Sequence, residues 1–396
     1  MQTRKRLCTR ILRYTLKGVS ALALFVASGC WGQRNIDQLT VVAAIGLDAA
    51  SDNQIEMSVQ LVNPTLPVAA GAGGQRRPFA MYSAKGETIF EVMEKIRKQA
   101  KKNLFFQQTR IVLIDERLAR RGLEEYMDFF WRNAQQNPLS WILISKKPAR
   151  STLQKSKELK DVPSDEWGEF LKNRRGNVSF TLKLYQFLPR IDQIGYQAYA
   201  AGIAPISKGG EKTAAISKLA VFKQDKLVGW LTDKQSQALG WLQGETRNGV
   251  IALSEQGSKP VVFELNHIRA RMVPVIHGNR IAFRVGIRAN ADLKSSSKNV
   301  NLTNVQTNRS LETKLAEQVR ESVEQTIERI CKTYNSDIIG FGEAVHRSYP
   351  QKWKQIKPRW DETLAELEVQ VDVSVRLIKT GLKSDQGGLQ QNGKEG

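Results

Sequence analysis

The residues with the most specific chemistry lie near the start of the chain, where Ala27, Ser28 and Gly29 lead directly to Cys30. Small residues that end at a cysteine form the lipobox of bacterial lipoproteins. In that motif the cysteine thiol takes a diacylglycerol, the chain is cut before the cysteine, and the new amine is often acylated. The spacing therefore predicts residues 1–29 as a cleaved lipoprotein signal peptide, and Cys30 as the site of S-diacylglycerol and N-acyl attachment.

The residues before the lipobox have the layout of a secretory signal. Six basic residues and no acidic residue precede an apolar run at 19–26, which is shorter than the roughly 20 residues that span a bilayer. An ordinary signal peptide with an incidental cysteine and an uncleaved short anchor are the alternatives. Because two or more acyl chains hold a protein on a membrane durably, we expect a body tethered to the outer face of a plasma membrane.

The charge of the chain favours a membrane surface over nucleic acid as a partner. The full chain of 396 residues has a net charge of +21, and removal of the six basic residues of the signal leaves +15. Such charge attracts anionic lipid headgroups or nucleic acid, and an export signal argues against nucleic acid. The length predicts two or three domains, at about 100–200 residues each.

Cysteine and histidine spacing predicts neither a disulfide nor a metal site. Cys8 leaves with the signal and Cys30 carries lipid, so Cys331 has no partner and is predicted to be a small buried side chain. The three histidines, His267, His277 and His346, show no metal-binding spacing. His277, in a predicted turn, and His346, near a predicted helix end, are expected to be exposed side chains without a ligand role. We predict no metal and no cofactor.

No pattern in the sequence predicts catalysis. Two acidic pairs, Glu124/Glu125 and Asp361/Glu362, resemble the couple of a glycosidase. Sequence does not give their separation, however, and solvated surface charge is the expectation. The Gly-Phe-Gly segment at 340–342 opens no nucleotide fingerprint and is predicted to serve close packing or a bend. We predict no catalytic residues and no enzymatic activity.

Hydrophobic patterning in the first half alternates between strands and helices. Strands are predicted at 39–48, 54–62, 110–115 and 139–146, and helices at 87–102, 117–132, 148–158, 164–173 and 181–194. The segment 63–78 is rich in Gly and Pro and is predicted to be a mobile loop. A phosphate-binding loop is disfavoured there, because no Lys-Ser/Thr pair follows its glycines. This alternation suggests a sheet covered by helices.

The second half is predicted to be richer in strands. A hairpin is expected at 218–230, a short helix with Asp233 as N-cap at 233–242, and strands that turn at 277–279 within 261–290. The longest helix is expected at 310–335 with Ser310 as N-cap, and the cleanest strand at 367–377, where apolar and polar residues alternate.

These elements predict an α+β fold with several domains, built from mixed or antiparallel sheets packed with helices. We place a boundary within 201–213, which is richer in Gly, Ser and Pro. The predicted units are an N-terminal α/β region at 30–205, a C-terminal α+β domain at 206–382 with the long helix and long strand, and a disordered tail at 383–396.

A short segment near the C-terminus combines aromatic and basic residues. Lys352, Trp353, Lys354 and Lys357 are predicted to form part of a surface that meets a partner or a membrane. Anchoring of a loop onto the core by Trp353 and Trp360 is the alternative.

Motifs along the whole mature chain resemble one family. The chain begins with Cys30-Trp31, then Ile36, Leu39, Val42 and Ile45-Gly46-Leu47-Asp48. The middle holds Asn103-Leu104-Phe105, Arg110-Ile111-Val112-Leu113-Ile114 and Leu219-Ala220-Val221-Phe222. The most specific motif is Asn-Ser-Asp-Ile-Ile-Gly-Phe-Gly at 335–342, followed by His346, Tyr349-Pro350, Trp353 and Trp360. Together they resemble the spore germination lipoproteins of the Ger(x)C family, which are the C subunits of nutrient germinant receptors.

The resemblance implies a non-enzymatic receptor subunit on the outer surface of the spore inner membrane of a Bacillus-type bacterium. It implies multipass A and B subunits as partners in germinant sensing, and an α+β fold. Gly32 and Asn35 depart from the residues usual in the family at these positions. A solute-binding lipoprotein that feeds a transporter and a cell-wall hydrolase are the alternatives, although the two halves do not look alike and no catalytic constellation is found.

Overall fold

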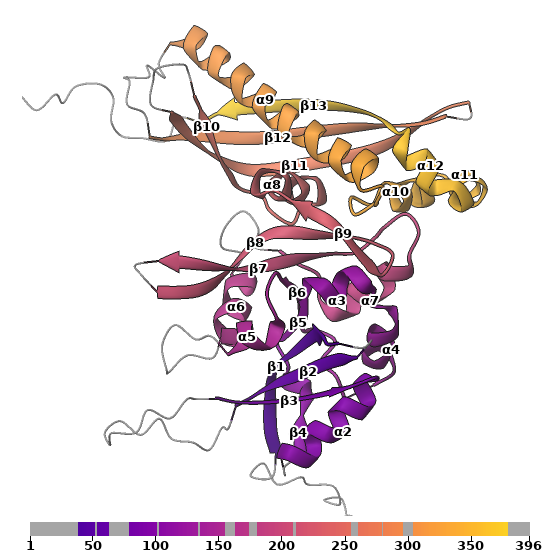
Figure 1. Ribbon diagram of the computed structural model, residues 1–396. Helices are drawn as coiled ribbons and strands as arrows, with labels where there is room; N and C mark the ends of the chain where they lie inside the picture. Colours follow the sequence, from indigo (N-terminus) through magenta and orange to yellow (C-terminus); the bar gives the residue numbers. More distant parts are fainter. Residues whose placement is uncertain are drawn as a thin grey trace, which may run out of the picture.

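The computed structural model describes residues 39–51, 54–62, 79–100, 103–133, 135–154, 163–173, 180–208, 211–254, 260–278, 280–295 and 304–378. These residues form two sheets, one above the other in Figure 1, with a helix between them. The predicted lipobox, the predicted loop at 63–78 and the predicted tail at 383–396 lie outside the described residues.

The larger sheet, sheet A, has nine strands in the order β3-β2-β1-β5-β6-β7-β8-β9, with β4 also paired to β1. Its strands are β1 Leu39–Ala49, β2 Ile55–Val62, β3 Phe79–Gly86, β4 Asn103–Phe105, β5 Ile111–Asp115, β6 Trp141–Ser145, β7 Tyr199–Lys208, β8 Glu211–Lys223 and β9 Lys226–Leu231. The central strands β1, β5, β6 and β7 run parallel, while antiparallel strands lie at both ends. The central β5 is buried along its whole length, as expected where helices cover both faces.

Helices cover both faces of sheet A (Figure 1). One face carries α2 Ile89–Ala100, α3 Glu116–Arg121, α4 Glu124–Arg132 and α7 Leu184–Asp192, and the other carries α5 Ala149–Leu153 and α6 Pro163–Lys172. Gly46 of β1 permits a close approach of α5, because a Cβ there would crowd Ala149 and Leu153. The predicted sheet covered by helices is therefore confirmed.

The single helix predicted at 117–132 is wrong, because the chain forms two helices with a break at Gly122. Gly122 has φ of 132°, which is unfavourable for other residues. The carboxylate of Asp225, in the turn between β8 and β9, accepts hydrogen bonds from the backbone N–H groups of Leu123 (3.0 Å) and Glu124 (3.3 Å). Asp225 thus provides an acceptor for the first turn of α4, at the helix end where anions are favoured.

The smaller sheet, sheet B, has four strands in the order β10-β11-β12-β13. They are β10 Gly249–Leu253, β11 Val261–His277, β12 Arg280–Ser295 and β13 Glu368–Leu377. The hairpin of β11 and β12 and the alternating strand β13 confirm the predictions for 261–290 and 367–377. The last strand pairs in parallel with β12. One face of sheet B packs against α8 Asp233–Gln243, α9 Val305–Glu328 and α10 Phe341–Ser348, and the chain continues through α11 Pro350–Ile356 and α12 Trp360–Ala365.

Two predicted helix caps are wrong by a few residues. Thr232, not Asp233, caps α8: its Oγ1 accepts from the N–H of Gln235, whose side chain accepts from the N–H of Thr232 in return. Asn304, not Ser310, caps α9 through two backbone N–H groups, so the helix starts earlier than predicted. A π-helical turn at Arg329–Thr333 then ends the helical run.

The predicted boundary at 201–213 falls inside sheet A. β7 and β8 pair along this stretch, so the sheet continues from the first predicted domain into the second. The predicted hairpin at 218–230 is confirmed as β8 and β9. The division into units at 205/206 stays a proposal.

We expect Val371→Asp to destabilise the protein strongly, whereas Gln370→Asp is tolerated. Val371 is 5% exposed and faces α9, while Gln370 is exposed on the other face of β13. An unpaired buried charge costs several kcal/mol, which is comparable to the whole stability of a domain at about 5–15 kcal/mol. Thermal melting of the two purified variants checks this, and equal melting temperatures would contradict the facing of the strand.

Candidate functional site

The segment 335–342, the most specific of the family motifs, lies where the two sheets meet. It follows the π-helical turn and leads into α10. Gly340 stands directly before α10 with φ of 93°, and Asn335 has φ of 45°. Positive φ is unusual outside glycine, so these residues make a tight bend that places Asp337 at the N-terminus of α10.

Asp337 is the most heavily hydrogen-bonded carboxylate of the described residues. Its Oδ1 accepts from the backbone N–H groups of Gly340 (2.8 Å) and Phe341 (2.9 Å). Its Oδ2 accepts from the N–H of Gly342 (2.7 Å) and from the indole Nε1–H of Trp360 (3.1 Å). The side chain is 1% exposed. Four donors converge on one buried carboxylate, which fixes the start of α10 against α12.

The environment of Asp337 changes its ionisation. Burial raises the pKa of Asp337 to about 6, and the four hydrogen bonds oppose that rise. Asp48, in the family motif at 45–48, is a second case: its carboxylate accepts from the N–H groups of Ala149 and Arg150 at the start of α5, and burial raises its pKa to about 6. Both motifs therefore use a buried aspartate to fix a helix start.

The same segment joins the two halves of the protein. The backbone of Asp337 exchanges two hydrogen bonds with Gln197, and the Ser336 hydroxyl donates to the carbonyl of Phe222 in β8. The Tyr334 hydroxyl donates to the carbonyl of Trp230 in β9 (2.8 Å) and accepts from its N–H (3.2 Å). We call this set of contacts, made by residues 334–342, the junction.

Helix α8 completes this contact between the sheets. It touches β8 and β9 of sheet A, β11 of sheet B and α9. Its residues from Ser236 to Leu242 are all buried, which is typical of a helix surrounded by protein. The two sheets are thus held by a buried helix and by the junction.

Trp353, which was predicted as part of a surface, is in fact buried. It is 5% exposed, and its ring meets that of Trp360 edge-on with centroids 5.1 Å apart. A Cβ at Gly342 would overlap this ring and Gly195, so the glycines permit close packing there, as predicted for 340–342. The alternative, anchoring of a loop onto the core by Trp353 and Trp360, is correct as to their burial, although the two residues lie on α11 and α12 rather than in a loop. Around them, Lys354 and Lys357 are exposed and Lys352 is half-buried.

The other candidate groups behave as surface or packing residues. His267, His277 and His346 are exposed, as are Glu124, Glu125, Asp361 and Glu362. In the part of the chain that the structure describes, no three His, Cys, Asp or Glu side chains gather as metal ligands. Cys331 is buried as predicted, and burial raises the pKa of its thiol. Cys30 lies outside the described residues, so its predicted lipid attachment is not tested by the structure.

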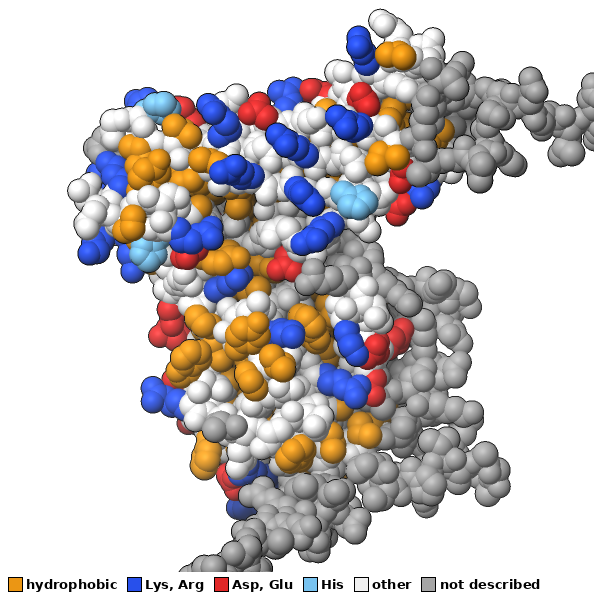
Figure 2. All heavy atoms as spheres, turned by 180° about the vertical axis from the view of Figure 1, so that it is seen from behind, with side chains coloured by type: hydrophobic (Ala, Val, Ile, Leu, Met, Phe, Trp, Pro, Cys, Tyr) orange, Lys and Arg blue, Asp and Glu red, His pale blue; other side chains and the backbone are white. Residues whose placement is uncertain are grey.

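Sequence reasoning missed a basic surface on sheet B. Figure 2 shows Lys and Arg side chains spread across this end of the molecule, on the side turned away in Figure 1. The signal was present in the sequence as arginines at alternate positions of β11 and at every fourth position of β12, but only the strand pairing brings them together.

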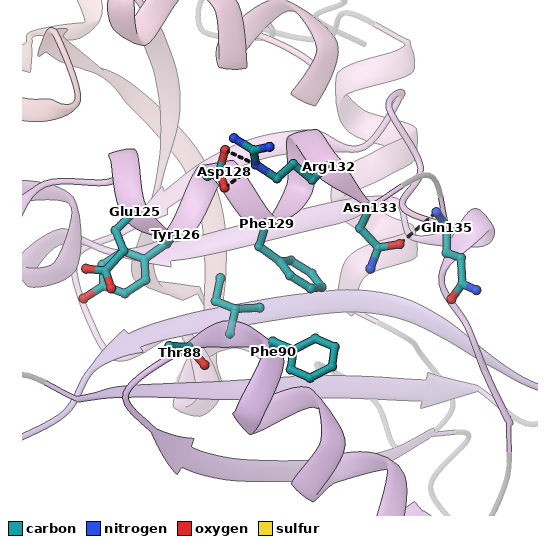
Figure 3. A pocket seen from close by; sticks show the side chains of 10 residues that line it. Thr88, Phe90, Glu125, Tyr126, Asp128, Phe129, Arg132, Asn133 and Gln135 are labelled. Carbon is teal, nitrogen blue, oxygen red and sulfur yellow. Dashed lines mark hydrogen bonds and ion pairs between the residues drawn. The ribbon is translucent and has the colours of Figure 1, made fainter.

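An apolar groove lies between α2 and α4, with a volume of about 600 Å³. Figure 3 shows Phe129 of α4 directed toward Phe90 of α2, and Phe90 is 63% exposed. Polar side chains at its rim pair among themselves, as Asp128 does with Arg132. Nothing in the described residues shows what covers this groove.

Comparisons with known proteins agree with the motifs on which this geometry rests. The family described as "Spore germination protein N-terminal domain" matches residues 32–205, and "Spore germination B3/GerAC like, C-terminal" matches residues 217–381. The chain therefore belongs to the GerAC-like family of spore germination proteins, the Ger(x)C family.

Individual relatives align along almost the whole chain. Spore germination protein KC of Bacillus subtilis is 25% identical, over 92% of this chain and 95% of its own length. Spore germination protein B3 of the same organism is 21% identical, over 90% and 96%. The crystal structure of the GerBC protein has a TM-score of 0.56 at 17% identity, covering 85% of this chain and 97% of its own, and it shares the α+β fold. No helix among the described residues is long and apolar enough to cross a membrane.

Proposed function

We propose that this protein is the membrane-anchored lipoprotein subunit of a spore nutrient germinant receptor. The observation that carries the proposal is the match of two spore germination families to consecutive parts of the chain, which together leave little of the body unmatched. Its relatives are named as germination proteins and align from end to end. On this proposal the protein is required for the response to germinant.

The proposed place of the protein is the outer surface of the spore inner membrane. Cys30 would carry a diacylglycerol and an N-acyl chain such as palmitate after removal of residues 1–29. Two or more acyl chains are enough for durable anchoring. The partners we propose are the multipass A and B subunits of the receptor.

We propose a scaffold or coupling role without turnover of its own. The junction supports this role, because buried hydrogen bonds hold Ser336 and Asp337 against Phe222 and Gln197 on the side of sheet A. The helix α10 that follows packs against β11 of sheet B. Because the two sheets then move together as one rigid unit, a partner that binds sheet A also displaces sheet B. The predicted units, 30–205 and 206–382, would meet inside sheet A, where β7 pairs with β8, and Gln197 of the first unit would bind the junction.

The proposal is tested by purifying the tagged protein from spore membranes. Co-purification of multipass A and B subunits is expected. We also expect the triple variant Lys352→Glu, Lys354→Glu and Lys357→Glu to weaken this co-purification at unchanged melting temperature, because charge at an interface rim affects association more than folding. Intact co-purification by the variant would mean that these lysines take no part in the contact with the partners.

The matched control for that experiment places the same charge change elsewhere. Lys98, Lys147 and Lys172 are exposed on the part of the molecule around sheet A. Their replacement by glutamate changes the net charge equally and is expected to leave co-purification unchanged. Equal losses in the two variants would show an effect of net charge alone.

A solute-binding lipoprotein of a transporter is the alternative function. Such a protein needs two similar lobes around a cleft, whereas the two sheets here differ in strand number and order. Tight binding of a free germinant by the purified protein, without its partners, would favour this alternative over the scaffold role.

A further inference from the structure

The outer face of sheet B carries an array of arginines that no helix of the described residues covers. We call it the arginine face; its residues, all exposed, are Arg269 and Arg271 of β11, Arg284 and Arg288 of β12, and Arg376 of β13. The opposite face of the same strands is buried by residues such as Val285, Ile287 and Val371. Alternation along each strand therefore sends every one of these arginines to the same side.

The strand register places these positive charges close together. Arg269 lies directly opposite Arg288, and Arg271 lies two positions further along β11. Directly opposite residues in an antiparallel pair have Cβ atoms about 4.5–5.5 Å apart, and like charges in such positions destabilise the sheet. The arrangement costs stability, so it is not explained by folding.

None of the five arginines forms an ion pair within the described residues. Four acidic residues of the described strands share the face, Glu264 of β11, Asp292 of β12, and Glu368 and Asp372 of β13, but no ion pair joins any of them to one of these arginines. Glu264 pairs with Lys294, and Asp292 accepts a hydrogen bond from Asn266. The arginines of the helices behave differently. Arg120, Arg132 and Arg320 each bind a carboxylate three or four residues away, at 2.6–2.7 Å. The arginine face is thus left with unused donors.

The shape of the array indicates the kind of ligand. Guanidinium groups bind phosphate through paired N–H donors. The five side chains extend over three neighbouring strands as well as along them, so they form a two-dimensional patch rather than a line. A flat anionic surface matches this pattern, whereas an extended acidic peptide would follow a single line.

We propose that the arginine face docks on an anionic phospholipid surface, as a second membrane contact beside the lipid anchor. This inference rests on the proposed function, because the anchor at Cys30 supplies the membrane. Leu39, the first described residue, lies nine residues after Cys30, so the link spans at most about 30 Å. Leu39 pairs with β4, at the end of sheet A away from sheet B (Figure 1). Docking of the arginine face therefore lays the tethered body along the membrane, where headgroups are at high effective concentration.

The test uses the complete, lipidated protein in vesicles, with a fluorescent probe on the face. Val273→Cys places one reactive thiol opposite Arg284, where Val273 is 40% exposed. Cys331 does not compete for the label, because it is buried and its thiol pKa is raised. A polarity-sensitive dye at position 273 is expected to shift to the blue in vesicles containing phosphatidylglycerol and not in pure phosphatidylcholine. Salt at about 0.5 M, which shortens the Debye length to about 4 Å, should reverse the shift.

The variant Arg269→Gln, Arg284→Gln and Arg288→Gln should lower the docking equilibrium constant roughly 100-fold, at about fivefold for each charge removed. The matched control is Arg120→Gln, Arg132→Gln and Arg320→Gln, which removes the same charge from helices and should leave docking unchanged. A dye at Ser310→Cys, on α9 away from the face, should not shift.

Several outcomes would overturn the proposal. They are an equal shift in phosphatidylcholine, a shift at position 310 instead of 273, an equal effect of the control arginines, or no shift in anchored protein. Binding of a poly-glutamate peptide by protein that ignores phosphatidylglycerol would assign the face to an acidic polypeptide instead. Vesicle flotation separates these results from failure of the anchor, because protein that does not float has lost the anchor rather than the face contact.

Discussion

Asp337→Ala is expected to lower the free energy of unfolding by several kcal/mol and to prevent accumulation of the protein at growth temperature. The substitution leaves four buried donors without an acceptor, namely the N–H groups of Gly340, Phe341 and Gly342 and the indole N–H of Trp360. Each unsatisfied buried group costs about 1–3 kcal/mol, and the total is comparable to a domain's stability of about 5–15 kcal/mol. Chemical denaturation of the purified variant measures the loss.

Asp361→Ala is the matched control. Asp361 lies on α12 and pairs with Lys223 at 2.9 Å on the surface, where an ion pair contributes only about 0–1 kcal/mol. A similar loss of stability in both variants would contradict the role of the buried carboxylate.

The cost of Asp337→Ala should also depend on pH. Because burial raises the pKa of Asp337 to about 6 in the folded protein, from its ordinary value of 3.8, folding favours the protonated side chain. The stabilisation that the protonated Asp337 side chain gives to the folded state is fully present below pH 3.8, and it is lost as the pH rises through about 6. The difference in unfolding free energy between wild type and variant should therefore shrink by roughly 3 kcal/mol over this window, since a tenfold change in proton affinity corresponds to about 1.4 kcal/mol. A difference that grows instead would show that the four hydrogen bonds outweigh burial.

Cys30→Ala is expected to abolish lipid labelling and to leave the signal uncut by the lipoprotein peptidase. The thiol is the proposed acceptor of the diacylglycerol, and no other residue of the lipobox can form that bond. Germination through this receptor should fail, because the body would lose its place beside its partners. Metabolic labelling with palmitate measures the first effect and the size of the mature chain the second.

Two other cysteines provide controls for this labelling. Cys8 lies in the predicted signal, and Cys331 is buried beside the junction. Cys8→Ala and Cys331→Ala should both retain full palmitate label. Undiminished palmitate label in the Cys30→Ala variant would contradict the assignment of Cys30 as the lipidated residue.

Strands with strong local patterns were predictable from the sequence. The strands predicted at 39–48, 54–62 and 367–377 match β1, β2 and β13 to within about one residue at each end. Their apolar residues alternate or run continuously, and this pattern depends on burial within the strand itself. The strand β3 was missed, because half of its residues are only half-buried and its pattern does not alternate.

The features that sequence reasoning missed depend on residues far apart in the chain. The break between α3 and α4 requires Asp225, about a hundred residues later, to supply the acceptor for α4. The role of Asp48 as an acceptor for α5 lies across a similar separation. Caps within a few residues, such as Asn304 and Thr232, were near the predicted positions, because several polar residues compete locally for the role.

The candidate site also combines features that a local pattern predicts with features that it does not. The motif at 335–342 was recognised as specific, and close packing by its glycines was predicted. The role of Asp337 as the centre of the site was not predicted. Three of its four donors lie within five residues, so this helix cap was open to sequence reasoning, whereas the indole of Trp360, 23 residues later, was not. The lysines around Trp353 suggested that the tryptophan belongs to the surface, but its ring fills the space left by Gly195 and Gly342.

The late position of β13 in the chain determines the order in which the protein can fold. All strands of sheet A precede residue 232, so that sheet can assemble while later residues are still being synthesised. Sheet B cannot be completed until β13 arrives, because its parallel partner β12 ends more than seventy residues earlier. Such non-local pairing is slow, since loop closure must precede the gain from contacts. Until β13 pairs, β12 presents an unpaired edge and α9 lacks its apolar cover, which makes the newly made chain prone to aggregation. The yield of folded protein then depends on how soon β13 is synthesised and pairs with β12.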